Sequence, residues 1–192
     1  MTVQGAILCG GKSSRFGSDK ALAPLLQNEV PAVVSLYTLM LELHLNPILL
    51  CGDKNRYADL GMESVEDIIK NCGPLSGLHA GLCQTHANAL LVLPVDMPHI
   101  TGADLNTLLG AYLKNQRPTF FTVAQNISPF PGIFTKAILP TILQHLQTQH
   151  YAMQPLIQNL TSKNTILHNA KNHFSNINSH QDWCKIKEKE LL

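Results

Sequence analysis

Charged residues are scarce in this sequence: Asp, Glu, Lys and Arg make up 14% of its 192 residues, and the net charge is +1. A chain so nearly neutral has no general field to attract nucleic acid or an anionic membrane surface, so we expect neither as a partner. Long apolar runs are also missing, since none reaches the roughly 20 residues of a membrane span. The first apolar run ends at Gly10 and has no positively charged segment before it, unlike a signal peptide. We therefore expect a cytoplasmic protein.

Cysteine is present, but not in the patterns that would give it a structural role. The count is five, which is odd, and no C-x-x-C pair occurs. Both facts argue against a disulfide framework and against a zinc knuckle. We expect reduced and mostly buried thiols at Cys9, Cys51, Cys72, Cys83 and Cys184.

Repeats, low-complexity tracts and linkers rich in Pro, Gly or Ser are absent. With 45% hydrophobic residues, the chain is predicted to form a single domain, 1–192, with a substantial core. Strand-like runs alternate with helix-length segments, which predicts an α/β fold with a mostly parallel sheet and helices on both faces. We expect strands at 3–9, 47–51, 64–66, 89–95 and 119–124, and helices at 31–45, 77–86, 104–114, 135–149 and 181–191. Pro140 is expected to kink or divide the helix at 135–149.

A glycine-rich loop follows the first predicted strand, in the stretch ILCGGKSSRFGSDKA at residues 7–21. Gly10 and Gly11 lack a Cβ, so backbone N–H groups there can approach an anion closely. Three cations share the loop: Lys12, Arg15 and Lys20. The glycine spacing fits neither a Walker loop nor the G-x-G-x-x-G of a dinucleotide fold. A lone loop of this kind is also compatible with a flexible surface turn, so the rest of the sequence must decide.

An aspartate follows the most apolar predicted strand, in LPVDMP at residues 93–98. Ligands of parallel sheets bind beyond the carboxyl ends of the strands, and Gly10, Asp67 and Asp96 all follow predicted strands. Alone, the motif is equally compatible with an Asp that begins a turn before Pro98. Together with the glycine loop it indicates a magnesium site, because proteins usually hold Mg²⁺ with one or two carboxylates, substrate phosphates and waters.

In these motifs the chain resembles the molybdenum cofactor guanylyltransferases, a family within the nucleotidyltransferases of the nucleotide-sugar type. The family opens on a pattern of the form L-A-G-G-x-x-x-R-M-G-x-D-K-A-L, and the sequence keeps step with it at Leu8, Gly10, Gly11, Arg15, Gly17, Asp19, Lys20, Ala21 and Leu22. The likeness resumes at residues 66–67, 73–82, 93–98, 129–134 and 174–178, and so spans nearly the whole chain. The departures are Cys9, Phe16, Cys51 in place of an Asn that contacts the base or ribose, and QNEVP at 27–31 in place of an Asn-Gly-Lys-Pro turn.

The resemblance implies a three-layer, Rossmann-like nucleotidyltransferase fold and the transfer of GMP from GTP to molybdopterin, with release of pyrophosphate. Mg²⁺ is the implied cofactor, and proteins of molybdoenzyme maturation are implied as partners besides the two substrates. It assigns catalysis to Arg15, Lys20 and Asp96, with Asp96 also the metal ligand. It assigns nucleotide binding to Leu8, Cys9, Gly10, Gly11, Lys20, Asp67 and Asp96, and the pterin side to Asn176 and Asn178.

Two alternatives stay open on the sequence. The nearer one is a cytidylyltransferase for the same pterin, or another sugar-phosphate nucleotidyltransferase. Such relatives tend toward Ala-Ala-Gly and Pro-Lys where this chain has Cys-Gly-Gly and Asp-Lys. The other is a non-catalytic nucleotide-binding protein, which Cys51 and QNEVP favour and which the presence of both Lys20 and Asp96 opposes.

Overall fold

A seven-stranded sheet forms the centre of the computed structural model, which describes residues 2–10, 19–24, 29–97, 99–123, 126–160 and 165–168. The strand order is β3-β2-β1-β4-β6-β5-β7. Only β6 runs against its neighbours, β4 and β5, and the other paired strands of the described chain are parallel. The strands are β1 (Val3–Leu8), β2 (Ile48–Gly52), β3 (Ser64–Glu66), β4 (Ala89–Pro94), β5 (Thr119–Val123), β6 (Asn126–Thr135) and β7 (Thr165–His168).

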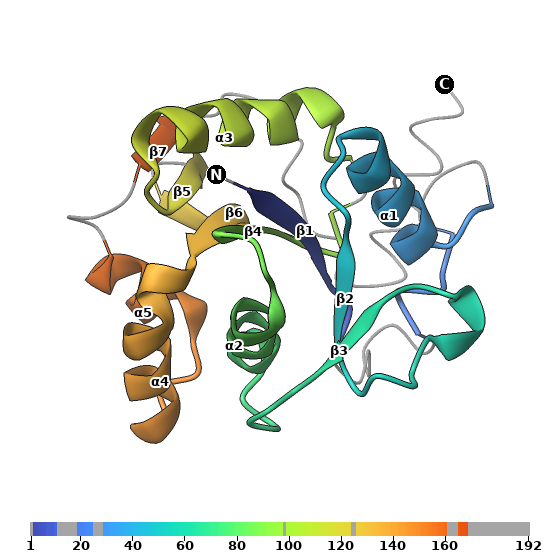
Figure 1. Cartoon of the computed structure of the whole chain (residues 1–192), viewed down its shortest axis with the longest axis horizontal. Helices are drawn as coiled ribbons and strands as arrows, with labels where there is room; N and C mark the ends of the chain where they lie inside the picture. The colour runs from blue at the N-terminus through green and yellow to red at the C-terminus, as the bar shows by residue number, and fades with distance from the viewer. Residues whose placement is uncertain are drawn as a thin grey trace.

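Helices cover both faces of this sheet, which makes a fold of three layers (Figure 1). One face carries α1 (Ala32–Glu42) and α3 (Gly102–Asn115), and the other carries α2 (Pro74–Gln84), α4 (Leu139–Gln147) and α5 (Met153–Asn159). Strands covered on both sides lose all contact with water, so nearly continuous apolar runs are expected in them. The strand β4 fits this rule, because its residues from Ala89 to Leu93 are buried without interruption. The α/β fold with a mostly parallel sheet is thereby confirmed.

Two glycines let α2 lie close against the sheet. A Cβ on Gly77 would come within 3.1 Å of Leu50 Cβ and 3.2 Å of Leu8 Cδ2. A Cβ on Gly81 would meet side-chain atoms of Leu50 and Leu90, each at 2.9 Å. Larger residues would therefore force the helix away from β1, β2 and β4. The close fit brings the first turn of α2, with Pro74, to the edge where these strands end.

The predicted strands all occur, with ends that differ by a residue or two, and the helices at 31–45 and 104–114 occur as α1 and α3. The helix at 77–86 begins earlier, at Pro74, where a proline is tolerated because the first N–H has no helical partner. The helix expected at 135–149 occurs as α4, but its predicted start at residue 135 was wrong. Thr135 ends β6, Lys136–Ile138 form a 3₁₀ turn, and Pro140 lies in the first turn of α4 without kinking it.

The sequence did not predict β6, α5, β7 or the two 3₁₀ helices, Ala58–Leu60 and Lys136–Ile138. The strand β6 contains Pro129 and Pro131, which oppose strand formation in a central position, and its pairing with β5 is irregular between Phe120 and Phe121. Residue 124 and the helix expected at 181–191 lie outside the described residues.

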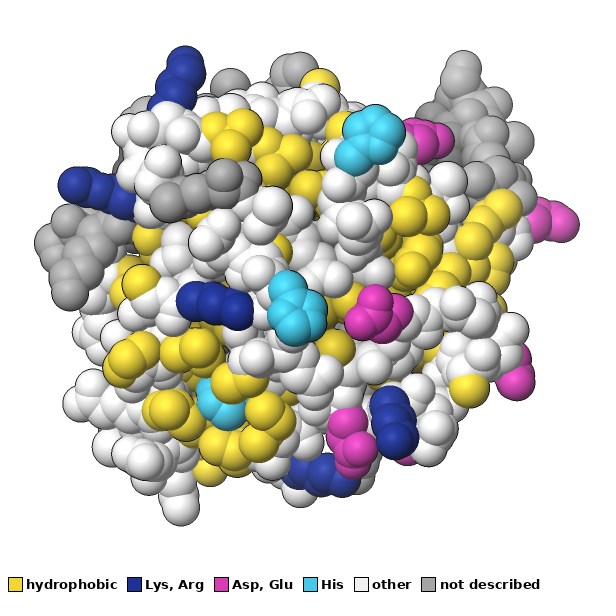
Figure 2. All heavy atoms as spheres, in the orientation of Figure 1, with side chains coloured by type: hydrophobic (Ala, Val, Ile, Leu, Met, Phe, Trp, Pro, Cys, Tyr) yellow, Lys and Arg dark blue, Asp and Glu magenta, His cyan; other side chains and the backbone are white. Residues whose placement is uncertain are grey.

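The surface agrees with the low charge content of the sequence. On the face seen in Figure 2, Lys and Arg side chains are scattered rather than gathered into one basic patch. Within the described part of the chain, no helix combines the length and apolar character that a bilayer crossing needs.

Candidate functional site

Two adjoining cavities lie where β1, β2, β3 and β4 end. The first, which we call the Asp96 cavity, measures about 330 Å³ and is lined by Cys9, Asp19, Lys20 and Asp96 among others. The second, the Asp67 cavity, measures about 510 Å³ and is lined by Cys51, Asp53, Arg56 and Asp67 among others. Leu8, Gly10 and Pro74 line both. Residues from the ends of four strands and from the start of α2 therefore line two adjoining cavities.

Asp96 lies in the turn that follows β4. The turn closes with a hydrogen bond from Met97 N to Pro94 O (3.4 Å), so Asp96 is both a turn residue and a cavity residue. Its Oδ2 lies 3.6 Å from Lys20 Nζ, and the two side chains are only 20% and 14% exposed. Its Oδ1 is buried without a hydrogen-bond partner. Burial raises the pKa of Asp96, and Lys20 opposes that rise.

The donor set fits a magnesium ion held by few protein ligands. A buried carboxylate oxygen without a partner is costly unless a ligand or water supplies the missing interaction. No group of three or more His, Cys, Asp or Glu residues able to hold a metal occurs among the described residues. An ion bound at Asp96 would take phosphate oxygens and waters as further ligands, as Mg²⁺ favours.

Gly10 stands at the junction of the two cavities. Its N–H donates to Leu50 O at 3.2 Å, and Cys9 N donates to the same oxygen, also at 3.2 Å. The Gly10 amide is therefore occupied by the sheet, and a phosphate oxygen would have to compete with the Leu50 carbonyl for it. Gly11 lies outside the described residues. The role predicted for these two amides stays a prediction.

Asp67 follows β3 and faces the second cavity. Its backbone N–H donates to Gly52 O (3.3 Å), and its Oδ1 is buried without a hydrogen-bond partner. Burial is the main cause that raises the pKa of Asp67. Gly52 has a φ of +81°, and a Cβ there would lie 3.4 Å from Asp67 Oδ2, so this glycine both permits the turn and leaves room for the carboxylate. Asp67 thus lines the cavity and keeps a hydrogen-bond acceptor that no described group uses.

Two departures from the family pattern meet in the sheet. Leu8 pairs with Leu50 in the parallel ladder of β1 and β2, so Cys9 and Cys51 occupy the next pair of positions. The Cys51 thiol lies within hydrogen-bonding distance of Asp53 O (3.0 Å) and lines the Asp67 cavity. Interaction with the Cys51 side chain, together with burial, raises the pKa of Cys9. The four described cysteines are free, and three are buried, as expected; Cys184 lies outside the described residues.

Arg56 and Tyr57 are site residues that the sequence did not indicate. Arg56 Nη2 donates to Asp19 Oδ2 at 2.9 Å, and the Tyr57 hydroxyl lies 3.0 Å from the same oxygen. They belong to the loop after β2, where no recognised motif or spacing singles them out. The contact crosses 37 positions of sequence, which only the folded chain reveals.

The structure places five of the predicted site residues in the Asp96 cavity: Leu8, Cys9, Gly10, Lys20 and Asp96. Asp67 lies in the adjoining cavity. Four others, Gly11, Arg15, Asn176 and Asn178, lie outside the described residues.

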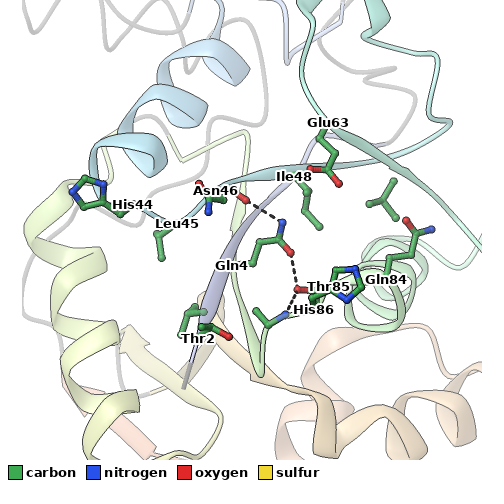
Figure 3. A pocket seen from close by; sticks show the side chains of 13 residues that line it. Thr2, Gln4, His44, Leu45, Asn46, Ile48, Glu63, Gln84, Thr85 and His86 are labelled. Atoms are coloured by element: carbon green, nitrogen blue, oxygen red, sulfur yellow. Dashed lines mark hydrogen bonds between the residues drawn. The ribbon is translucent and has the colours of Figure 1, made fainter.

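A larger cavity, about 720 Å³, lies at the opposite edge of the sheet, where β1 begins (Figure 3). The Gln4 side chain, which points into it, is engaged at both its nitrogen and its oxygen. Gln4 Nε2 donates to Asn46 O at 3.1 Å, and Thr85 Oγ1 donates to Gln4 Oε1 at 2.6 Å. The Asp96 and Asp67 cavities instead hold carboxylate oxygens without partners, so we place the functional site there despite their smaller size.

The chain is similar in sequence to several known proteins. Residues 5–164 match the model of the MobA-like NTP transferase domain. A probable molybdenum cofactor guanylyltransferase from Flavobacterium johnsoniae is 30% identical over 179 residues, which cover 90% of each chain. One from Pelotomaculum thermopropionicum is 28% identical over 193 residues and covers 95% of this chain and 91% of its own.

Solved structures share the fold. The molybdopterin-guanine dinucleotide biosynthesis protein A of Archaeoglobus fulgidus has a TM-score of 0.80 at 19% identity, covering 100% of this chain and 99% of its own. A CMP:2-keto-3-deoxy-manno-octonic acid synthetase complexed with CTP has a TM-score of 0.74 at 14% identity, covering 100% and 98%. One fold thus serves proteins named for different nucleotides, and the fold alone does not select the base.

The ion pair of Lys20 and Asp96 can be tested by titration. Lys20→Met should raise the pKa of Asp96, because the ammonium that favours the charged carboxylate is lost while burial remains. The side-chain carboxyl ¹³C shift of Asp96, followed by NMR against pH, measures this. Arg117→Met, outside both cavities, is the control and should leave the titration unchanged. An unshifted Asp96 in the Lys20→Met protein would show that Lys20 does not support its charge.

Proposed function

Since this chain belongs to the family of MobA-like NTP transferases, we propose that it transfers GMP from GTP to molybdopterin and releases pyrophosphate. It is a nucleotidyltransferase, and the choice of GTP and molybdopterin follows the names of its relatives. The observation that carries the proposal is the ion pair of Lys20 and Asp96, in which Asp96 Oδ1 has no hydrogen-bond partner. The adjoining cavity is lined by Asp67. A triphosphate fits the first arrangement and a nucleoside the second.

In the proposed reaction a phosphate oxygen of molybdopterin attacks the α-phosphorus of GTP. A new P–O bond forms, the bond from the α-phosphorus to the bridging oxygen breaks, and pyrophosphate leaves with that oxygen. Transfer of this kind depends on in-line positioning and charge neutralisation more than on a protein base. Lys20 is placed to neutralise charge on the phosphates, and Arg15 is predicted to share that role.

Asp96 is the residue that would hold Mg²⁺, through its Oδ1. When bound, the ion would neutralise charge on the phosphate oxygens. Lys20 then has two tasks, since its ammonium also keeps Asp96 in the charged form that a cation requires.

We propose that Asp67 binds the nucleoside. Its free oxygen can accept a hydrogen bond from an N–H of the base or a hydroxyl of the ribose. Guanine offers donors of this kind, and so does ribose in any nucleotide, so Asp67 anchors the nucleoside without choosing it alone. The pterin side remains assigned to Asn176 and Asn178 by resemblance only.

A cytidylyltransferase is the second candidate. Cys51 lines the Asp67 cavity in place of the family's Asn that contacts the base or ribose, so a contact that would help to select guanine is changed. Turnover with molybdopterin and each of GTP, CTP and ATP separates the candidates. We expect the highest kcat/KM with GTP. A higher value with CTP would replace the guanylyl assignment, and no turnover with any of them would favour a non-catalytic role.

Asp96→Asn should reduce kcat at least about 10²-fold, the scale for losing one electrostatic stabiliser at a reacting centre. The amide keeps the shape of the side chain but lacks the charge that holds a divalent cation. Steady-state turnover at several Mg²⁺ concentrations measures the effect, and circular dichroism checks the fold. Activity near wild type with the usual Mg²⁺ dependence would leave Asp96 as a turn residue only.

Asp67 predicts a pH dependence of nucleotide binding. Because burial raises its pKa, the Asp67 carboxylate gains a proton at a higher pH than an ordinary Asp, whose pKa is about 3.9. GTP should therefore bind more weakly as the pH falls through the raised pKa of Asp67. Calorimetric Kd values from about pH 8 to about pH 5 test this. Asp67→Asn is the matched control, since it cannot titrate and the phosphates titrate equally in both proteins. Parallel pH profiles would contradict the role.

A further inference from the structure

Asp19, the neighbour of Lys20, lies within hydrogen-bonding distance of three donor groups. Arg56 Nη2 lies 2.9 Å from Oδ2, the Tyr57 hydroxyl lies 3.0 Å from Oδ2, and Ala21 N donates to Oδ1 at 3.1 Å. The Asp19 and Arg56 side chains are 26% and 27% exposed, so their charge-assisted hydrogen bond is largely shielded from water. With both oxygens engaged, Asp19 is poorly placed to act as a second metal ligand.

Tyr57 connects this carboxylate to the end of β1. Its side chain is buried, its ring lies 5.3 Å from the Arg56 guanidinium carbon, and its hydroxyl is 3.2 Å from Cys9 O. A phenol has one proton, so at any moment the hydroxyl donates either to Asp19 or to the Cys9 carbonyl. In both cases it lies between the residues that precede and follow segment 10–18.

The turn that carries Lys20 is also fixed on its other side. Leu22 N donates to Asp19 O at 3.1 Å and Ala23 N to Lys20 O at 3.3 Å, which closes the turn. The first residues of α1 then bind the turn, since Val33 N donates to Ala21 O and Ala32 N to Ala23 O, both at 3.0 Å. Fixed from both sides, the backbone at Lys20 brings the ammonium to 3.6 Å from Asp96.

We propose that Asp19, Arg56 and Tyr57 form a clamp of positioning residues that fixes Lys20 beside Asp96 for nucleotidyl transfer. The clamp also joins the two cavities, because Asp19 lines the Asp96 cavity and Arg56 lines the Asp67 cavity. It acts through Lys20 and touches no reacting atom. The catalytic part of this inference rests on the proposed function, whereas the hold on Lys20 does not.

The cleanest variant is Tyr57→Phe, which removes one hydroxyl and no charge. We expect kcat with GTP and molybdopterin to fall about three- to tenfold, the scale of one hydrogen bond, with a smaller change in KM. Tyr112→Phe, in a buried side chain of α3, is the matched control and should keep wild-type kcat. Equal kcat in Tyr57→Phe and wild type would overturn the clamp.

A double-mutant cycle with Lys20→Met shows whether the clamp acts through the lysine. Once the ammonium is gone, Tyr57→Phe should cost less than about twofold, because the group that it positions is absent. The same fold-loss with and without Lys20 would mean that Tyr57 acts independently, and the proposal would fail. Asp19→Asn, tested in the same cycle, covers the case in which Tyr57→Phe does not fold.

Chemical labelling tests the hold on Lys20 without any substrate. The lysine side chain is 14% exposed, so amine acylation at Lys20 should be slow in the wild type and at least about threefold faster in Tyr57→Phe and Asp19→Asn, read by peptide mass spectrometry. Lys70, 63% exposed, normalises the rates. If the variants label faster but the wild-type protein does not turn over GTP, the clamp on Lys20 stands and the proposed function is refuted. Unchanged labelling in an active protein would refute the clamp alone.

Discussion

The ion pair between Lys20 and Asp96 is the interaction around which the carboxyl edge of the sheet is arranged. Each side chain is mostly removed from water, and a charge removed from water is unfavourable unless an opposite charge lies near. Because Asp96 follows β4 and Lys20 follows the loop after β1, the pair exists only when these adjacent parallel strands are in register. The geometry of the sheet therefore determines the charge state of the site.

The two cavities are best understood as one site with two chemical environments. Leu8, Gly10 and Pro74 form a shared wall without charged side chains, while carboxylates stand on either side of it. The close packing of Gly77 and Gly81 against Leu50 keeps Pro74 in that wall. A change in the packing of α2 would thus alter both environments together, although neither Gly77 nor Gly81 lines the Asp96 cavity.

Sequence reasoning reached the parallel half of the fold and the residues that follow its strands. Apolar runs such as Ala89–Pro94 identify strands because burial on both faces leaves no room for polar residues. The strand β6 was not predicted, because its prolines and its glycine interrupt the alternation of apolar and polar residues that indicates a strand. Its pairing with β4 in the folded chain is what makes it a strand. Arg56 and Tyr57 were not predicted for a related reason. Their partner, Asp19, is distant in sequence, and no motif in their own loop points to it.

The reversed direction of β6 divides the edge of the sheet between two kinds of chain segment. In the antiparallel pair Val92 lies opposite Gly132, so the residues before Gly132, among them Phe130, run past the end of β4 to the Asp96 cavity. On the parallel side, the Asp96 cavity is lined by residues at the ends of strands and just after them. On the antiparallel side, it is lined by Phe130, in the first half of β6. Residues 126–128 pair with β5 rather than with the parallel strands, so a change at Phe130 would alter one side of the Asp96 cavity and leave in place the ladder that supports Lys20, Asp67 and Asp96.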